Sequence, residues 1–258
     1  MKLNFLPQRP SKPRQKGLTM IMDKGLTTVE AAGLCAMAED SIDLVKFGFG
    51  TSLFSGNVKE KIAIYKEAGI DVYLGGTLLE AAYIRGQLAD YTAFADRLGI
   101  STIEVSDGSI ILDHAEKCAL IATLSKRYRV ISEVGSKVAG NEIPTDRWIE
   151  MMQSELAAGS WKVIAEAREA GNIGIYDCKG TANTEMIEQI SAKISSDSIV
   201  WEAPQKAQQV WFVKHLGADV NLGNIAPAEV ISLETIRCGL RGDTFALHLP
   251  DHLKTKVQ

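Results

Sequence analysis

The chain has 258 residues, of which 46% are hydrophobic and 23% are charged, so it is long enough to bury a large core without disulfides. Its 28 lysines and arginines against 32 aspartates and glutamates give a net charge of −4, which argues against nucleic acid as the main partner, because no overall positive field attracts phosphate backbones. It contains no run of about 18 apolar residues, so no transmembrane helix is expected.

The first 17 residues differ in composition from the rest of the chain. They carry Pro7, Pro10 and Pro13 among basic residues, and they lack the apolar core of a signal peptide. We expect residues 1–17 to form an extension that is partly disordered. The alternative is a strap that crosses one end of the fold.

The cysteine pattern bears on the compartment. The four cysteines are scattered and form no Cys-x-x-Cys pair: Cys35, Cys118, Cys178 and Cys238. Together with the missing signal peptide, this pattern indicates free thiols in a reducing environment. We therefore expect a cytoplasmic protein.

Short runs rich in Val, Ile and Leu recur along the rest of the chain. They begin near Leu18, Ile42, Ile70, Thr102, Arg129, Trp161, Ser198 and Ala218. Several are almost continuously apolar, which is typical of strands that are covered on both faces. Stretches with helical period lie between them; in 57–69, for example, Val58, Ile62 and Tyr65 share one face and Gly69 suits the helix end.

Signals for helix starts recur with the same regularity. Capping-box spacing is found at Thr27/Glu30, Asn57/Glu60, Thr77/Glu80 and Asp113/Glu116, and Pro227 suits the first turn of a last helix. Eight strand–helix units predict an α/β fold, a single (β/α)8 TIM barrel over residues 18–245, with a C-terminal tail at 246–258. A doubly wound open sheet is less favoured, because the segment DKGLTT after the first strand has no Gly-x-Gly-x-x-Gly.

Polar residues follow the predicted strands at their carboxyl ends, where a barrel builds its active site. In chain order they are Asp23, Lys24, Lys46, Gly75, Gly76, Thr77, Glu104, Asp107, Glu133, Lys137, Glu166, Arg168, Glu202, Lys206, Asn221 and Asn224. Arg241 follows the last predicted helix, in GLRGDTF. Rim ion pairs could explain any single one of them. Because burying charges costs several kcal/mol each unless they are paired or bind a ligand, a charge at so many strand ends favours a binding site.

The carboxylates among them favour a metal site. Glu133, Glu166 and Glu202 end three consecutive predicted strands, and converging hard oxygen ligands suit Mg²⁺. Asp107 or Glu104 could replace any one of the three.

The basic residues indicate an anionic substrate. Lys24, Lys46, Arg168 and Arg241 would supply positive charge, and arginine can hold phosphate or carboxylate through two parallel hydrogen bonds. Asn224 at the last strand end is a further candidate for substrate binding.

Two further groups suggest how an anion would be held and a proton moved. Gly75, Gly76 and Thr77 can bring backbone N–H groups and a helix start to an anion, although Thr77 and Glu80 could equally form only a helix cap. Lys137, in SEVGSK, could lose its proton near neutral pH and act as a general acid or base. The residues alone therefore predict Mg²⁺-assisted enolate chemistry on a phosphorylated acid.

Motifs along the chain resemble the phosphosulfolactate synthase family over about residues 18–245. They are DKG at 23–25, VKFGFGTS at 45–52, GGTLLE at 75–80, EVSDGS at 104–109, SEVGSK at 132–137, EAREAG at 166–171, EAPQKAQQ at 202–209, VNLGNI at 220–225 and ISLETIRCGLRGDTF at 231–245. Departures are mild: Phe49 stands where many members have Trp, Ala170 replaces a frequent Ser, Gly223 stands where Ala is common, and the segment after Gly171 is shorter than in archaeal members.

The resemblance implies a (β/α)8 barrel that catalyses Mg²⁺-dependent addition of sulfite to phosphoenolpyruvate, giving (2R)-2-O-phospho-3-sulfolactate. The pathway would be coenzyme M biosynthesis or sulfolactate formation. Lys137 would protonate C2, with Lys24 or Lys46 as alternative acids, or it would only clamp the phosphate. We expect a homo-oligomer with small-molecule substrates and no membrane or nucleic-acid partner.

Two alternatives from other classes remain open. The plant branch of the family suggests a non-catalytic, heat-stress-associated barrel. A different barrel lyase or aldolase would use a lysine to form a Schiff base.

Overall fold

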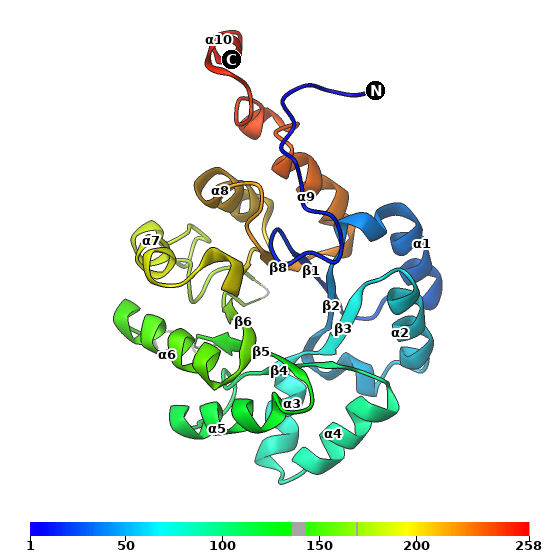
Figure 1. Ribbon diagram of the computed structural model, residues 1–258. Helices are drawn as coiled ribbons and strands as arrows, with labels where there is room; N and C mark the ends of the chain where they lie inside the picture. The colour runs from blue at the N-terminus through cyan, green and yellow to red at the C-terminus, as the bar shows by residue number, and fades with distance from the viewer. Residues whose placement is uncertain (136–142, 169, 258) are drawn as a thin grey trace.

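The computed structural model describes residues 1–135, 143–168 and 170–257, and these residues fold as a closed barrel of parallel strands (Figure 1). The strands pair in chain order, and β8 pairs with β1 to close the barrel. They are β1 (Thr19–Asp23), β2 (Leu44–Phe47), β3 (Asp71–Leu74), β4 (Thr102–Val105), β5 (Arg129–Val134), β6 (Ser160–Ala165), β7 (Ile199–Glu202) and β8 (Leu222–Ile225).

Helices follow the strands and surround the barrel, except α10, which lies near the C-terminus and apart from the barrel (Figure 1). The α-helices are α1 (Thr28–Ala38), α2 (Val58–Glu67), α3 (Gly76–Ile84), α4 (Leu88–Arg97), α5 (His114–Leu124), α6 (Thr145–Ala158), α7 (Thr184–Lys193), α8 (Lys206–Leu216), α9 (Val230–Arg237) and α10 (Asp251–Lys254). Short 3₁₀ segments are η1 (Glu39–Ser41), η2 (Gly48–Leu53), η3 (Ser196–Ser198), η4 (Pro227–Glu229) and η5 (Gly242–Thr244). The prediction of a (β/α)8 barrel is confirmed. None of the described helices is both long and apolar enough to cross a bilayer.

Local sequence signals account for several helix starts. Thr27 caps α1 in a full capping box with Glu30, and Asp113 caps α5 by accepting backbone N–H bonds. Asn57 precedes α2 but makes no side-chain cap bond. The spacing of Thr77 and Glu80 is not a cap, because α3 begins one residue earlier, at Gly76.

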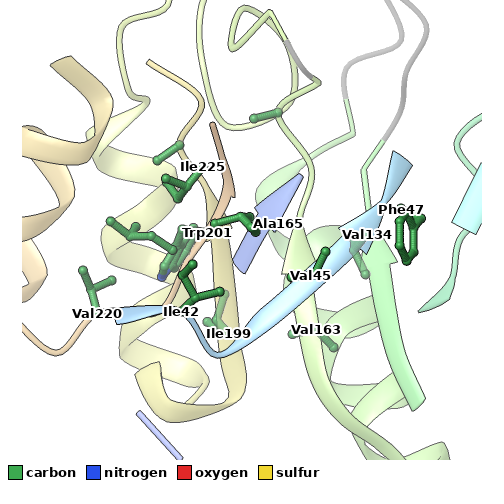
Figure 2. Packing of buried hydrophobic residues seen from close by; sticks show 14 of the residues in the cluster. Ile42, Val45, Phe47, Val134, Val163, Ala165, Ile199, Trp201, Val220 and Ile225 are labelled. Atoms are coloured by element: carbon green, nitrogen blue, oxygen red, sulfur yellow. The ribbon is translucent and has the colours of Figure 1, made fainter. Parts of the chain in front are cut away.

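The alternation of side chains along each strand separates two hydrophobic cores. The outer core lies between strands and helices, and Figure 2 shows part of it, including Val45, Phe47 and Trp201. The inner core fills the barrel and consists of Leu18, Met20, Leu44, Tyr73, Ile131, Ile164 and Val200, with Trp161 packed against it. Because successive side chains of a strand point to opposite faces, the residue two positions after an inner-core residue also points inward.

This two-residue step places polar groups above the inner core. In β2, Leu44 is in the inner core and Lys46 follows it by two, whereas Val45 and Phe47 belong to the outer core. The same step leads from Ile131 to Glu133, from Ile164 to Glu166 and from Val200 to Glu202. The inward-facing pattern thus changes from apolar to charged near the carboxyl ends of the strands.

The N-terminal segment lies against the opposite end of the barrel. Arg9 forms ion pairs with Asp219, just before β8, and with Glu234 of α9. The buried side chain of Arg14 pairs with Asp43, just before β2, at 2.7 Å. The contacts of residues 9–17 therefore tie this segment to the amino ends of the strands.

Lys162, at the start of β6, joins the same segment to the barrel. Its Nζ donates a hydrogen bond to the carbonyl oxygen of Gln15 at 2.9 Å and another to the carbonyl oxygen of Asp197. Burial lowers the pKa of Lys162 from 10.5 to about 8. The charged form is thus disfavoured in the folded protein relative to the unfolded chain.

A pH-dependent contribution to stability follows from Lys162. Between pH about 8 and about 10.5 the unfolded chain holds more protons on this lysine than the folded protein, so its contribution to the free energy of unfolding rises with pH. We expect the stability of the wild type relative to Lys162→Met to increase across this window, measured by urea unfolding. The exposed Lys126→Met should show no such change, and a pH-independent difference for Lys162→Met would contradict the prediction.

Candidate active site

A cavity of about 290 Å³ opens at the carboxyl ends of the strands. Its walls combine strand-end residues with the segments that follow them: Met22, Lys46, Phe49, Thr77, Glu133, Glu166, Arg168, Ala170, Glu202 and Asn224. This is the end of the barrel at which (β/α)8 enzymes hold their active sites.

Lys46 lies among three buried carboxylates. Its Nζ is 3.0 Å from Oε2 of Glu104, 3.4 Å from Oε2 of Glu133 and 3.6 Å from Oε1 of Glu202. Burial alone would lower the pKa of Lys46, but attraction to the three carboxylates outweighs it and raises the pKa well above 10.5. Lys46 therefore stays an ammonium at neutral pH and balances part of the buried negative charge.

A backbone N–H group in the first turn of α3 binds the carboxylate of Glu104. Its Oε1 accepts a hydrogen bond of 2.6 Å from the backbone N–H of Gly76. A Cβ on Gly76 would lie 2.1 Å from Oγ of Ser106 and 2.8 Å from Oε1 of Glu104, so only glycine allows this close approach. The N–H group that the sequence suggested for a bound anion is thus used by a carboxylate of the protein itself.

Three carboxylates form a compact group in the cavity wall. One oxygen from each of Glu133, Glu166 and Glu202 lies within 4.8 Å of the others. Oε2 of Glu202 also accepts the backbone N–H of Ala167 at 3.0 Å. Burial raises the pKa of Glu202 to about 7, and the nearby charge of Glu133 adds to the rise while Lys46 opposes it. The donor set, carboxylate oxygens on three adjacent strands, suits a hard divalent cation.

Arg168, Asn224 and Thr77 bring further polar groups to the cavity. The backbone N–H of Arg168 donates to Oε1 of Glu166, and its side chain is exposed at the cavity mouth. Asn224 is buried and lines the cavity with an Oδ1 atom that has no hydrogen-bond partner in the described structure. The structure therefore places a cation, a hydroxyl and an amide around the carboxylates.

Asn224 reaches the cavity by a break in strand alternation. Leu222 and Ile225 both belong to the outer core, so regular alternation would turn Asn224 outward. Its φ of +56° interrupts the extended backbone of β8, and the register of β8 against β1 is irregular at this point. This geometry could not be read from the sequence.

Other candidates lie elsewhere. Lys24 is exposed and outside the described cavity lining, and Arg241 pairs with Asp243 at 2.6 Å, also outside that lining. Asp107 pairs with the buried Lys117 at 2.8 Å. Lys137 lies outside the described residues, so its role as the proton donor stays a prediction.

Asp23 illustrates why strand ends alone do not define a site. Its Oδ2 accepts bonds from Nζ of Lys61 at 2.8 Å and from the hydroxyl of Tyr65 at 3.1 Å, both on α2. Met22, one residue earlier, lines the cavity instead. Strand alternation explains this distinction once the structure shows Met20 in the inner core, because Met22 follows Met20 by two positions.

Sequence reasoning also missed two contributors. Phe49 lines the cavity, although in the sequence it was noted only as a departure from the family motif, between Gly48 and Gly50. Glu80 accepts hydrogen bonds from Oγ of Ser106 and from the N–H of Ser109, which ties α3 to the segment after β4. Nothing in the local pattern distinguished this role of Glu80 from a helix cap.

Comparison with protein families matches residues 7–243 to the model of (2R)-phospho-3-sulfolactate synthase (ComA). The phosphosulfolactate synthase of Methanothermobacter thermautotrophicus is 42% identical, over 92% of this chain and 95% of that protein. The phosphosulfolactate synthase of Bacillus subtilis is 38% identical, over 94% of this chain and 97% of that protein.

Solved structures share the fold at low sequence identity. The YdjI aldolase from Escherichia coli K12 superposes with a TM-score of 0.57 at 11% identity, covering 94% of this chain and 85% of that one. The phosphoenolpyruvate phosphomutase from Streptomyces platensis subsp. rosaceus superposes with a TM-score of 0.52 at 13% identity, covering 92% and 88%. At these identities the likeness supports the barrel fold alone.

The charge balance around Lys46 predicts a large effect of its removal. Lys46→Met leaves buried carboxylates without this ammonium, and breaking a buried ion pair typically costs about 3–5 kcal/mol of unfolding free energy. Adding Glu104→Gln to Lys46→Met should restore part of the loss, because it removes one buried charge and keeps an acceptor for the N–H of Gly76. Denaturant unfolding without divalent ions measures both changes.

A surface pair provides the control. Lys206 and Glu229 lie 3.3 Å apart with both side chains partly exposed, so Lys206→Met should cost less than about 1 kcal/mol. Equal costs for Lys46→Met and Lys206→Met would contradict the account of the buried cluster.

Proposed function

The chain belongs to the phosphosulfolactate synthase family, and from this membership we propose that it adds sulfite to phosphoenolpyruvate to form (2R)-2-O-phospho-3-sulfolactate. The observation that carries the proposal is the cavity at the carboxyl end of the barrel, where the ammonium of Lys46 contacts converging carboxylates. This arrangement suits a reaction in which negative charge moves onto a substrate carboxylate.

The bonds change in two steps. The sulfur lone pair of sulfite forms a bond to the CH₂ carbon, and the electrons of the C2–C3 double bond move into the carboxylate to give an aci-carboxylate. A proton then adds to C2 on one face, which restores the carboxylate and sets the R configuration. The donor regains its proton from solvent, so atoms and charges balance.

The described residues can bind and stabilise the charged groups of this reaction. Arg168 has the fork of donors that suits the phosphate or the carboxylate of the substrate, and Thr77 offers a hydroxyl at the first turn of α3. Lys46 stays charged and offsets the glutamates, so that an anion can approach them. Interactions of this kind lower the barrier to the extent that they are stronger in the transition state than in the ground state.

We propose that Glu133, Glu166 and Glu202 hold Mg²⁺, since carboxylate oxygens are its preferred protein ligands and these three converge. A bound Mg²⁺ would supply positive charge next to the oxygens on which negative charge develops. Lyase classification of the enzyme follows from the proposed reaction.

Lys137 is the proposed donor of the proton to C2. Lys46 is a poor donor, because its neighbours raise its pKa, and Lys24 lies outside the described cavity lining. The same raised pKa of Lys46 argues against the Schiff-base alternative at that residue, which would need a neutral amine. A cytoplasmic homo-oligomer that serves coenzyme M or sulfolactate formation remains part of the proposal.

Purified protein should consume phosphoenolpyruvate only when sulfite and Mg²⁺ are both present. The reaction is measured by the loss of the enol absorbance and by ³¹P NMR of the product.

Lys137→Ala should lower turnover by at least about 100-fold, the usual scale for general acid catalysis, while the protein stays folded. Arg168→Gln should chiefly raise the KM for phosphoenolpyruvate. Consumption that does not depend on sulfite would contradict the proposed reaction, and near-normal turnover of Lys137→Ala would remove Lys137 from it.

Metal binding can be measured without catalysis. Mn²⁺, used as a spectroscopic probe for Mg²⁺, should bind the wild type at one site by electron paramagnetic resonance, and Glu133→Gln or Glu166→Gln should weaken binding by at least about 10-fold. The exposed Glu150→Gln is the control and should bind as the wild type does. Loss of binding in Asp107→Asn, with the glutamate variants unaffected, would move the site to the segment after β4.

A further inference from the structure

Unusual backbone geometry in the described residues gathers around the cavity. Among the described residues, four that are not glycine have positive φ: Phe5 (+64°), Phe49 (+32°), Arg168 (+54°) and Asn224 (+56°). The last three line the same cavity. Strained backbone persists only where the surrounding structure enforces it, and it is concentrated at functional sites.

Phe49 is the least expected of the three, because aromatic residues rarely adopt φ +32° and ψ +44°. Glycines flank it on both sides, and Gly50 itself has a φ of +77°. A Cβ on Gly48 would lie 3.0 Å from Sδ of Met22, so the backbone next to Phe49 packs closely against Met22.

Burial does not explain the strain at Phe49. The residue is 52% exposed and belongs to neither the inner nor the outer core. A glycine at this position would adopt the same backbone at no steric cost. What the phenylalanine adds is a ring in the cavity wall.

The cavity wall combines apolar and charged residues. Three of the lining residues, Met22, Phe49 and Ala170, have apolar side chains, whereas the other lining residues are charged or polar. Of these, Met22 lies close to the turn that carries Phe49. Under the proposed function the substrate has the same division before sulfite adds: phosphate and carboxylate are charged, and the CH₂ end of the enol is apolar. The ring would contact one side of this CH₂ group, and sulfite would approach its carbon from another side.

We propose that Phe49 is a specificity-determining residue whose ring lies against the methylene end of phosphoenolpyruvate and limits the size of the group at that carbon. The inference rests on the proposed function. A substrate with a methyl group on the methylene carbon would meet the ring, whereas the same substrate would fit when residue 49 has no side chain.

The test compares phosphoenolpyruvate with phosphoenolpyruvate that carries a methyl group on C3, each with sulfite and Mg²⁺. In Phe49→Gly, kcat/KM for the methylated substrate relative to the parent should rise by about 10- to 200-fold, the range that one methylene is worth in an apolar pocket. The midpoint of thermal unfolding should be unchanged or higher, because glycine relieves the positive φ. Phe49→Leu keeps a bulky side chain and should give a smaller rise.

Two controls separate the ring from its backbone and its neighbourhood. Phe5→Gly relieves a positive φ at a residue that is 50% exposed and outside the cavity lining, so the substrate ratio should not change. Phe54→Ala removes a 91% exposed ring that follows η2 and should also leave the ratio unchanged.

The outcomes are distinguishable. A wild type that consumes phosphoenolpyruvate with sulfite, combined with an unchanged ratio in Phe49→Gly and Phe49→Leu, would overturn the role of Phe49 and leave the proposed function standing. An equal shift in Phe5→Gly, or loss of folded structure in Phe49→Gly by circular dichroism, would overturn it as well. No sulfite-dependent reaction in the wild type would instead be a failure of the proposed function.

Discussion

The interaction on which the site depends is the contact of one buried ammonium with several buried carboxylates. Lys46 reaches Glu104, Glu133 and Glu202 within 3.6 Å, and all of these side chains are buried. Removing such charges from water costs several kcal/mol each, and the cost is tolerated only where attraction and hydrogen bonds offset it. The barrel therefore contains a buried cluster of opposite charges that folding alone would not require. The chemistry of the cavity depends on this cluster.

The regular alternation of side chains along the strands is enough to create this arrangement. Lys46, Glu133, Glu166 and Glu202 each follow an inner-core residue by two positions, so one pleat of the barrel is apolar and the next is charged. The apolar layer supports the charged layer and keeps water from entering below it. At the opposite end, the contacts of residues 9–17 with the amino ends of the strands stabilise the fold away from the chemistry.

Stability and function make opposing demands at this cavity. Burial of Glu202 raises its pKa to about 7, and Phe49, Arg168 and Asn224 hold backbone angles that glycine would adopt more readily. Each feature lowers stability and places a chemical group in the cavity wall. Such local violations of sequence rules are expected at functional sites, where the rest of the fold compensates for them.

The sequence by itself determined the barrel, its eight strand–helix units and the family, because apolar period, helix caps and ordered motifs are local properties of the chain. It also identified Glu133, Glu166, Glu202 and Lys46 as strand-end charges. Only the tertiary structure decided which strand-end groups share the cavity. Whether a side chain points into or out of the barrel depends on the pleat and register of its strand. The side chain of Asp23 points toward α2, and the left-handed backbone at Asn224 brings that residue to the cavity. Loop paths decide the rest, since Asp107 meets Lys117 and Arg241 meets Asp243 through contacts that no short stretch of sequence encodes.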